Sequence, residues 1–188
     1  MMPTSPALPE LNDLVALFYD DAAQLGQFER VSALVVPEPF RRLLAHNAHM
    51  TVTVEEFNGC KVDVHVLIAR KDGDHYARKI LLTRQSDDAI VMFGVPRLRL
   101  SLLREDVRRE IEQQQTPLGR VLIEHNVLRE VQLVALWKIA PGPDLCRLFQ
   151  LAAPETIYGR TALIYCDGEP AVELLEIIAP ASSGPFTP

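Results

Sequence analysis

Two features of this chain have the chemistry needed to bind an anion. The first is the backbone of Thr116–Arg120, T-P-L-G-R. Thr is a good N-cap and Pro is favoured at the first helical position, so a helix is expected to begin here. Its free N–H groups from Leu118 onward could donate hydrogen bonds to a carboxylate. Arg120 lies in the first turn, where the helix dipole disfavours a cation, which indicates a partner or a ligand. The alternative is an ordinary capped surface helix with a solvated Arg.

The second feature is a set of charged side chains within apolar strand patterns. Arg78 and Lys79 are adjacent in H-Y-A-R-K-I-L-L, so in a strand they point to opposite faces. Glu173 and Glu176 are three apart in A-V-E-L-L-E-I-I-A and also alternate, and Arg160 begins a nearby apolar run. At least one basic and one acidic side chain are therefore expected on the face of the sheet that helices cover. They could form a structural ion pair, or line a pocket with an Arg for an anion and an acid at its far end.

Hydrophobic periodicity predicts the elements that position these groups. Apolar spacing of three and four indicates helices at 10–24, 37–47 and 102–114, besides the T-P-L-G-R helix. Alternation and turn signals indicate strands at 50–57, 61–70, 75–84, 89–99, 129–139, 159–166 and 171–179, with Asn58-Gly59 as a hairpin turn. Residues 143–151 could form one or two helical turns. Hairpins imply antiparallel pairing, so we expect an α+β fold with a single antiparallel sheet and helices against one face and one edge.

Composition limits the class of protein. The 188 residues carry a formal net charge of −6, which argues against binding to nucleic acid or an anionic membrane. No apolar run approaches the roughly 20 residues that span a bilayer, and no secretion signal is evident, so we expect a cytoplasmic protein. The three cysteines are far apart in sequence and indicate neither disulfides nor zinc. We expect one domain with a core at about 10–180 and loose termini at 1–9 and 181–188.

A metal site is not indicated either. His46 and His49 are three apart, but a metal needs at least one more ligand and no candidate is evident. His125 follows the T-P-L-G-R helix, where it can act as a favourable C-terminal cation when protonated. We therefore predict neither a metal nor a cofactor, and the sequence leaves the oligomeric state open.

These motifs together resemble the chorismate pyruvate-lyase (4-hydroxybenzoate synthase) family. The resemblance covers about 37–180 and rests on R-K-I, T-P-L-G-R-V-L-I-E-H and G-R-T-A-L-I-Y-C-D-G-E-P-A-V-E-L-L-E-I. It implies an antiparallel sheet of about six strands with helical flaps over an internal ligand pocket. The implied reaction eliminates enolpyruvate from chorismate, giving 4-hydroxybenzoate and pyruvate without a metal or cofactor.

The resemblance also implies roles for individual residues. Arg78 would hold the ring carboxylate, and the backbone N–H of Leu118 would contact the ligand. Counting back from the terminal proline of the motif places the family's acid at Glu176, whereas counting forward from the hairpin proline favours Glu173; we prefer Glu176 as proton donor or orienting group. The remaining candidates for binding are Thr116, Gly119, Arg120 and Arg160, and the two arginines could help with the second carboxylate of chorismate.

Two alternatives remain at this stage. One is a non-catalytic domain of the same fold that binds an aromatic acid, like the effector-sensing domains of some transcription regulators. The other is a lyase that acts on a modified chorismate.

Overall fold

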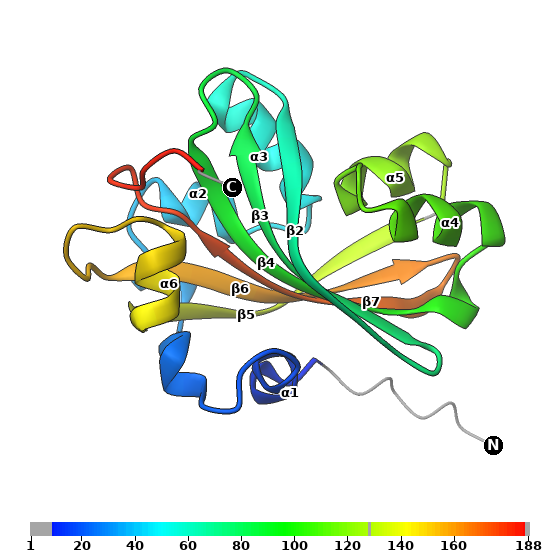
Figure 1. Ribbon diagram of the computed structural model, residues 1–188, viewed down its shortest axis with the longest axis horizontal. Coiled ribbons are helices and arrows are strands. Elements are labelled where there is room, and N and C mark those ends of the chain that lie inside the picture. The colour runs from blue at the N-terminus through cyan, green and yellow to red at the C-terminus, as the bar shows by residue number, and fades with distance from the viewer. Residues whose placement is uncertain (1–8, 128, 187–188) are drawn as a thin grey trace.

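A computed structural model describes residues 9–127 and 129–186 of the chain. Its main element is a seven-stranded sheet in which every hydrogen-bonded neighbour is antiparallel (Figure 1). The order across the sheet is β1-β5-β6-β7-β4-β3-β2. The strands are β1 Gly26–Val31, β2 Val62–Asp72, β3 His75–Arg84, β4 Ile90–Arg99, β5 Arg129–Pro141, β6 Ile157–Cys166 and β7 Glu169–Ile178.

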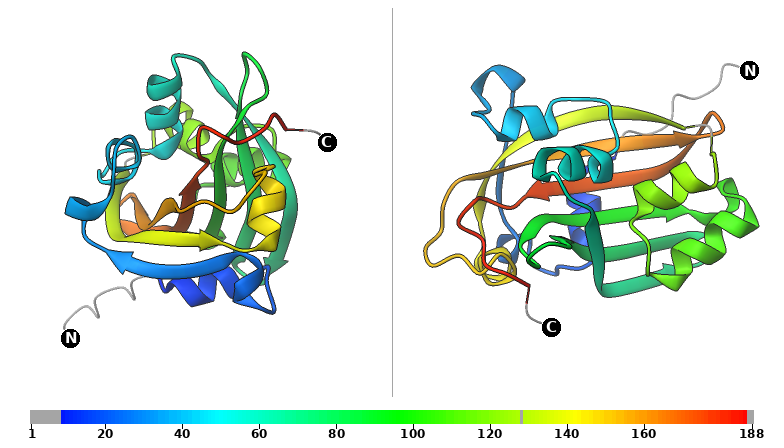
Figure 2. Two further views of the ribbon diagram at one scale, coloured as in Figure 1. Left: turned by 90° about the vertical axis from the view of Figure 1, so that its left-hand side faces the viewer. Right: turned by 90° about the horizontal axis from the view of Figure 1, so that it is seen from above.

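Helices cover both faces of this sheet. The α-helices are α1 Leu11–Ala16, α2 Phe40–Leu44, α3 Met50–Asn58, α4 Glu105–Gln113, α5 Leu118–Glu124 and α6 Pro143–Leu148, and the 3-10 helices are η1 Ala22–Gln24, η2 Ala33–Val35 and η3 Leu100–Leu102. The helices α2 to α5 lie over one face, and α1 lies below the sheet (Figures 1 and 2). Leu14 of α1 and Leu145 of α6 pack with Leu81 and Phe93 on that second face. The α+β prediction is confirmed, with helices on a second face as well as the first.

The segment at 50–57 forms a helix, so the strand predicted there is wrong. Met50, Thr51 and Val54 are the buried residues of α3, and their spacing fits one face of a helix. The β-branched alternation over 50–57 fits a strand equally well, so the pattern alone could not separate the two. Gly59 follows the helix with φ 66° and ψ 18°, the left-handed conformation that ends helices. The Asn-Gly pair is therefore a helix end. The strand that pairs with β2 is β3, through the Asp72–His75 turn.

Two other segments differ from the sequence prediction. The helix predicted over 10–24 is α1 followed by η1, and the chain then forms β1, an edge strand that pairs with β5. Residues 1–8 and 187–188 of the termini predicted to be loose lie outside the described residues. The described segment 181–186 packs on the fold, because the Phe186 ring stacks on His65 with centroids 4.1 Å apart and its N–H donates to the Asp88 carbonyl over 2.8 Å. Within the described residues, no helix is long and apolar enough to cross a membrane.

Candidate functional site

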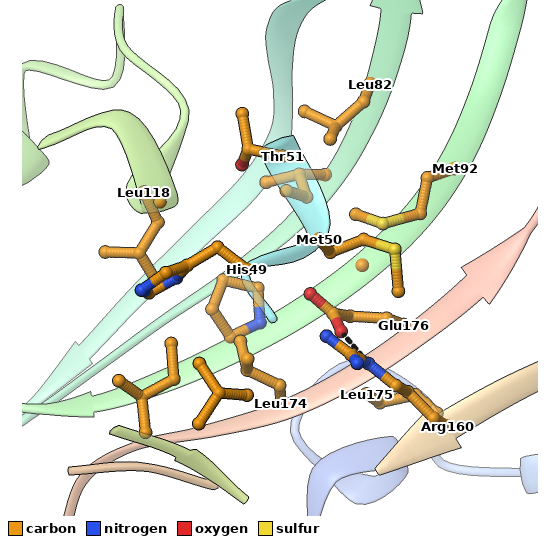
Figure 3. A pocket seen from close by; sticks show the side chains of 16 residues that line it. His49, Met50, Thr51, Leu82, Met92, Leu118, Arg160, Leu174, Leu175 and Glu176 are labelled. Atoms are coloured by element: carbon orange, nitrogen blue, oxygen red, sulfur yellow. Dashed lines mark hydrogen bonds and ion pairs between the residues drawn. The ribbon is translucent and has the colours of Figure 1, made fainter. Parts of the chain in front are cut away.

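A cavity lies between the sheet and the helices α3 and α5 (Figure 3). Its floor comes from β3, β4, β5, β6 and β7 and its roof from the starts of α3 and α5, and the empty space within it, including the opening to solvent, is about 490 Å³. Most of the lining is aliphatic or thioether, which suits an apolar ring. The lining residues are His49, Met50, Thr51, Ile80, Leu82, Met92, Gly94, Pro96, Leu118, Gly119, Val131, Arg160, Ile164, Leu174, Leu175 and Glu176.

One end of the cavity holds a buried ion pair. Arg160 of β6 is directly opposite Glu176 of β7 in the strand register, and its Nε donates to Glu176 Oε2 over 2.6 Å. Arg160 is fully buried and Glu176 is 6% exposed. The guanidinium also donates to the backbone carbonyls of His46 over 2.9 Å and Ala48 over 3.1 Å. Arg160 therefore orients the acid and holds the α2–α3 loop against the sheet.

Arg78 of β3 is fully buried but only weakly hydrogen-bonded. Its Nη1 donates to the Ile111 carbonyl over 3.4 Å, whereas Nε and Nη2 have no partner among the described residues. Burial lowers the pKa of this guanidinium from its ordinary value. Arg78 is on the same sheet face as the cavity residue Ile80, and the register on either side sets it opposite Pro96, another lining residue. A buried cation that has no counter-charge among the described residues thus adjoins the cavity.

The strand register sets the separation between this cation and the acid. Gly94 of β4 pairs with Ile80 on one side and with Glu176 on the other. Arg78, two residues before Ile80, is therefore displaced from Glu176 by about 7 Å along the strands and about 10 Å across them. Their backbones are about 12 Å apart on one face. The lining residues Gly94 and Pro96 of β4, the strand between β3 and β7, lie between them.

The T-P-L-G-R segment forms part of the roof. Pro117, with φ −55° and ψ 137°, is itself the N-cap of α5, one residue later than predicted, and Thr116 precedes it half-buried. Leu118 and Gly119 are buried and line the cavity. Arg120 points elsewhere, because its Nη2 forms an ion pair with Glu55 of α3. A cation in the first turn of a helix indicated a partner for Arg120, and that partner is Glu55 of the neighbouring roof helix α3.

Gly119 brings α5 close to α3, which leads to a prediction about the roof. A Cβ at this position would lie 2.8 Å from Thr51 Oγ1 and 3.2 Å from Thr51 Cβ. We expect Gly119→Ala to lower the free energy of unfolding by about 1–3 kcal/mol, as overpacking does. Urea denaturation measures this. Adding Thr51→Ala should restore part of the loss, and a single variant as stable as the wild type would contradict the close packing.

Glu173 and Lys79, the other charged candidates on these strands, lie on the opposite face of the sheet. Glu173 forms an ion pair with Arg97 of β4, so it does not reach the cavity that Glu176 lines. Lys79 donates to Asp144 of α6 over 2.6 Å and lies 4.5 Å from the centroid of the Tyr19 ring. The alternation of side chains along a strand thus places the two members of each pair, Arg78 with Lys79 and Glu176 with Glu173, on opposite faces of the sheet. Helices on the second face cover the members that point away from the cavity.

His49 is a cavity residue that the sequence did not indicate. It is the N-cap of α3, and its imidazole lies beside Leu118, at the end of the cavity remote from Glu176 (Figure 3). Its Nε2 is buried without a partner among the described residues. Burial, and then the charges of Arg129 and Arg160, lower the pKa of His49 to about 4, so the ring is neutral at pH 7. The H-N-A-H motif before the helix was the available signal, and the described residues contain no group of three or more His, Cys, Asp or Glu that could hold a metal.

His125 fastens the end of α5 to α4 and leads to a pH prediction. Its ring nitrogens lie 2.5 Å from Glu110 Oε2 and 3.1 Å from Asp106 Oδ2, and these contacts raise the pKa of His125 above its ordinary 6.5. Its stabilisation is therefore complete below pH 6.5 and is lost as the pH rises through the raised pKa. Urea denaturation should show wild type losing its advantage over His125→Gln as the pH rises from 6 to 9. A constant difference would contradict this linkage.

Comparison with known proteins shows the fold and no closer relationship. No family model and no curated protein matches the chain. The structure is similar to the crystal structure of PhnF from Mycobacterium smegmatis, with a TM-score of 0.50 and 9% identity over 73% of this chain and 66% of that chain, slightly under two thirds of its length. At that identity, the likeness shows a shared fold.

Weaker matches reach two further solved structures. One is the ligand-binding domain of a protein assigned to the GntR family of transcriptional regulators from Bordetella bronchiseptica, with a TM-score of 0.45, 11% identity and coverage of 68% and 90% of the two chains. The other is a GntR-family transcriptional regulator from Enterococcus faecalis, with a TM-score of 0.44, 10% identity and coverage of 66% and 99%.

Proposed function

We propose that this protein binds a small aromatic carboxylic acid in the cavity beneath α3 and α5. The observation that carries the proposal is Arg78, a fully buried guanidinium next to the cavity, two nitrogens of which have no partner in the part of the chain that the structure describes. A buried charge without a counter-charge is costly, and a carboxylate from a ligand would satisfy it with two parallel hydrogen bonds. The aliphatic side chains of Ile80, Leu82 and Met92 offer an apolar surface for the ring.

The acid at the other end of the cavity supports a hydroxyl at the far side of that ring. Glu176 projects into the cavity, and its Oε2 is held by Arg160 (Figure 3). A carboxylate in this position would accept a hydrogen bond from a para-hydroxyl while Arg78 holds the ring carboxylate. A 4-hydroxybenzoate-like ligand therefore matches both ends.

A second, catalytic candidate function is the elimination of enolpyruvate from chorismate, with 4-hydroxybenzoate as the retained product. The resemblance of the T-P-L-G-R and G-R-T-A-L-I-Y-C-D-G-E-P segments to chorismate lyases and the acid in the cavity favour it. The protein would hold the enolpyruvyl ether in a reactive geometry, with Glu176 orienting the ring hydroxyl or transferring a proton. Aromatisation of the ring supplies the driving force.

One pair of measurements tests both functions. Isothermal titration of the purified protein with 4-hydroxybenzoate, benzoate and phenol should give binding in that order of strength, because only the first ligand matches Arg78 and Glu176 together. Incubation with chorismate, followed by chromatography, then shows whether 4-hydroxybenzoate is formed. Binding without turnover would make the protein a non-catalytic aromatic-acid-binding domain. A folded protein that binds none of the acids would refute the proposal.

A further inference from the structure

A polar recess opens beside the cavity, on the outer side of His49. Asn47, Asn126, Arg129 and Glu130 contribute its polar side chains. His49 and Val131 line both the recess and the cavity. The two spaces therefore share a wall, and the recess lies at the end of the cavity remote from the Arg160–Glu176 ion pair.

Arg129 is the cation of this recess. It is the first residue of β5, and Val131 follows it on the same strand face, so the Arg129 side chain is on the face that bears the cavity. Its Nη1 donates to the Val127 carbonyl over 3.0 Å, and its Nε is buried without a partner among the described residues. Within the described part of the chain, no carboxylate lies within ion-pair distance of it. Arg129 is thus a second guanidinium with unused donors near the cavity.

The charges around the cavity do not balance. Arg78, Arg129 and Arg160 carry three positive charges, whereas the lining residues Glu176 and Glu130 carry two negative charges. His46 contacts Arg160, and burial and the charge of that arginine lower the pKa of His46, so it adds no further positive charge. His49 is the other titratable group at the shared wall, and the positive charge of Arg129 acts on it directly. Glu176 is paired with Arg160, so among the described residues Arg78 and Arg129 are the two guanidiniums near the cavity without an ion-pair partner, and each could bind one carboxylate of a ligand.

We propose that Arg129, with the imidazole of His49, forms a second anion-binding subsite at the mouth of the cavity, which accepts the second carboxylate of an aromatic dicarboxylate. This inference rests on the proposed function, because Arg78 would hold the first carboxylate. Arg129 can present Nε and a terminal nitrogen to the second carboxylate, and His49 Nε2 can donate to it when the proton is on that nitrogen. The subsite would make Arg129 a specificity-determining residue that distinguishes dianionic from monoanionic aromatic acids.

Two ligands that differ by one carboxylate arm test this subsite. These are 4-hydroxybenzoate and 3-(carboxymethoxy)-4-hydroxybenzoate, a stable dicarboxylate that cannot eliminate pyruvate. Isothermal titration with Arg129→Gln should show the dicarboxylate weakened tenfold or more and 4-hydroxybenzoate changed less than twofold. Arg129→Lys should restore part of the loss, because it keeps the charge. Arg30→Gln, which removes the same charge from the edge strand β1, should leave both affinities unchanged.

The outcomes separate this inference from the proposed function. If wild type binds neither ligand, the proposed function fails. If wild type binds both and Arg129→Gln weakens them equally or not at all, the proposed function stands and the second subsite is refuted. Thermal melting of each variant without ligand confirms that the fold is kept, and a loss of dicarboxylate binding in Arg30→Gln as large as in Arg129→Gln would assign the effect to net charge.

Discussion

Replacing Arg78 with Met is expected to weaken the binding of aromatic carboxylates strongly while the unliganded protein stays at least as stable as wild type. Truncating one partner of a buried charge pair typically weakens binding by about 2–5 kcal/mol, which is a factor of about 30 or more. The unliganded protein gains because Met fills a similar volume without a buried charge, and the Nε and Nη2 of Arg78 have no partners within residues 9–127 and 129–186. A residue that lowers the stability of the unliganded protein is typical of a functional site.

Titration calorimetry and urea denaturation measure the two effects of this substitution separately. Arg78→Lys is the matched variant, because it keeps the charge and loses the two-pronged geometry, so it should bind with intermediate affinity. If Arg78→Met bound 4-hydroxybenzoate as tightly as wild type, Arg78 would not be the carboxylate site. If Arg78→Met unfolded more easily than wild type, the guanidinium would have a structural role.

The second large effect is expected at Glu176. Glu176→Gln should lower the rate of 4-hydroxybenzoate formation from chorismate by about 100-fold or more if the cavity is catalytic, because the amide cannot accept or supply the proton. Whether or not turnover occurs, the variant should lose most of the preference for 4-hydroxybenzoate over benzoate, since a charge-assisted hydrogen bond is about twice as strong as a neutral one. Chromatography measures the rate, and titration of both acids measures the preference.

Glu173→Gln is the matched control for this substitution. It removes the same charge from the same strand, three residues away, and breaks an ion pair with Arg97 on the opposite face. Its turnover and ligand preference should stay within about twofold of wild type, because exposed and half-buried ion pairs contribute little. Equal effects of the two substitutions would remove Glu176 from the site.

Local signals in the sequence predicted much of the sheet. The strand at His75–Arg84 has the predicted bounds, and the hairpin turns at Gly73 and Gly168, each of which follows an Asp, have positive φ. The prediction failed at α3, where a short amphipathic helix and a strand give similar patterns and an Asn-Gly pair fits both a hairpin and a helix end. It also missed β1, an edge strand that is set by its pairing with β5.

The candidate site was predictable where alternation in a strand decides the face. The opposite directions of Glu173 and Glu176, and of Arg78 and Lys79, follow from period two. The role of His49, the ion pair between Arg120 and Glu55 and the unused donors of Arg129 depend on contacts between segments far apart in sequence. Loops and helix ends bring these groups together, and no local sequence pattern predicts contacts between such distant segments.

The bonds from Arg160 to the carbonyls of His46 and Ala48 have a kinetic consequence. If the α2–α3 loop moves away to admit or release a ligand, these bonds break and leave a fully buried guanidinium with fewer acceptors, which is costly. Opening of the roof would then be slow relative to ordinary loop motion, so the residence time of a bound acid would depend on Arg160 more than on the groups that touch the acid. In a catalytic protein, product escape would set the pace of the cycle.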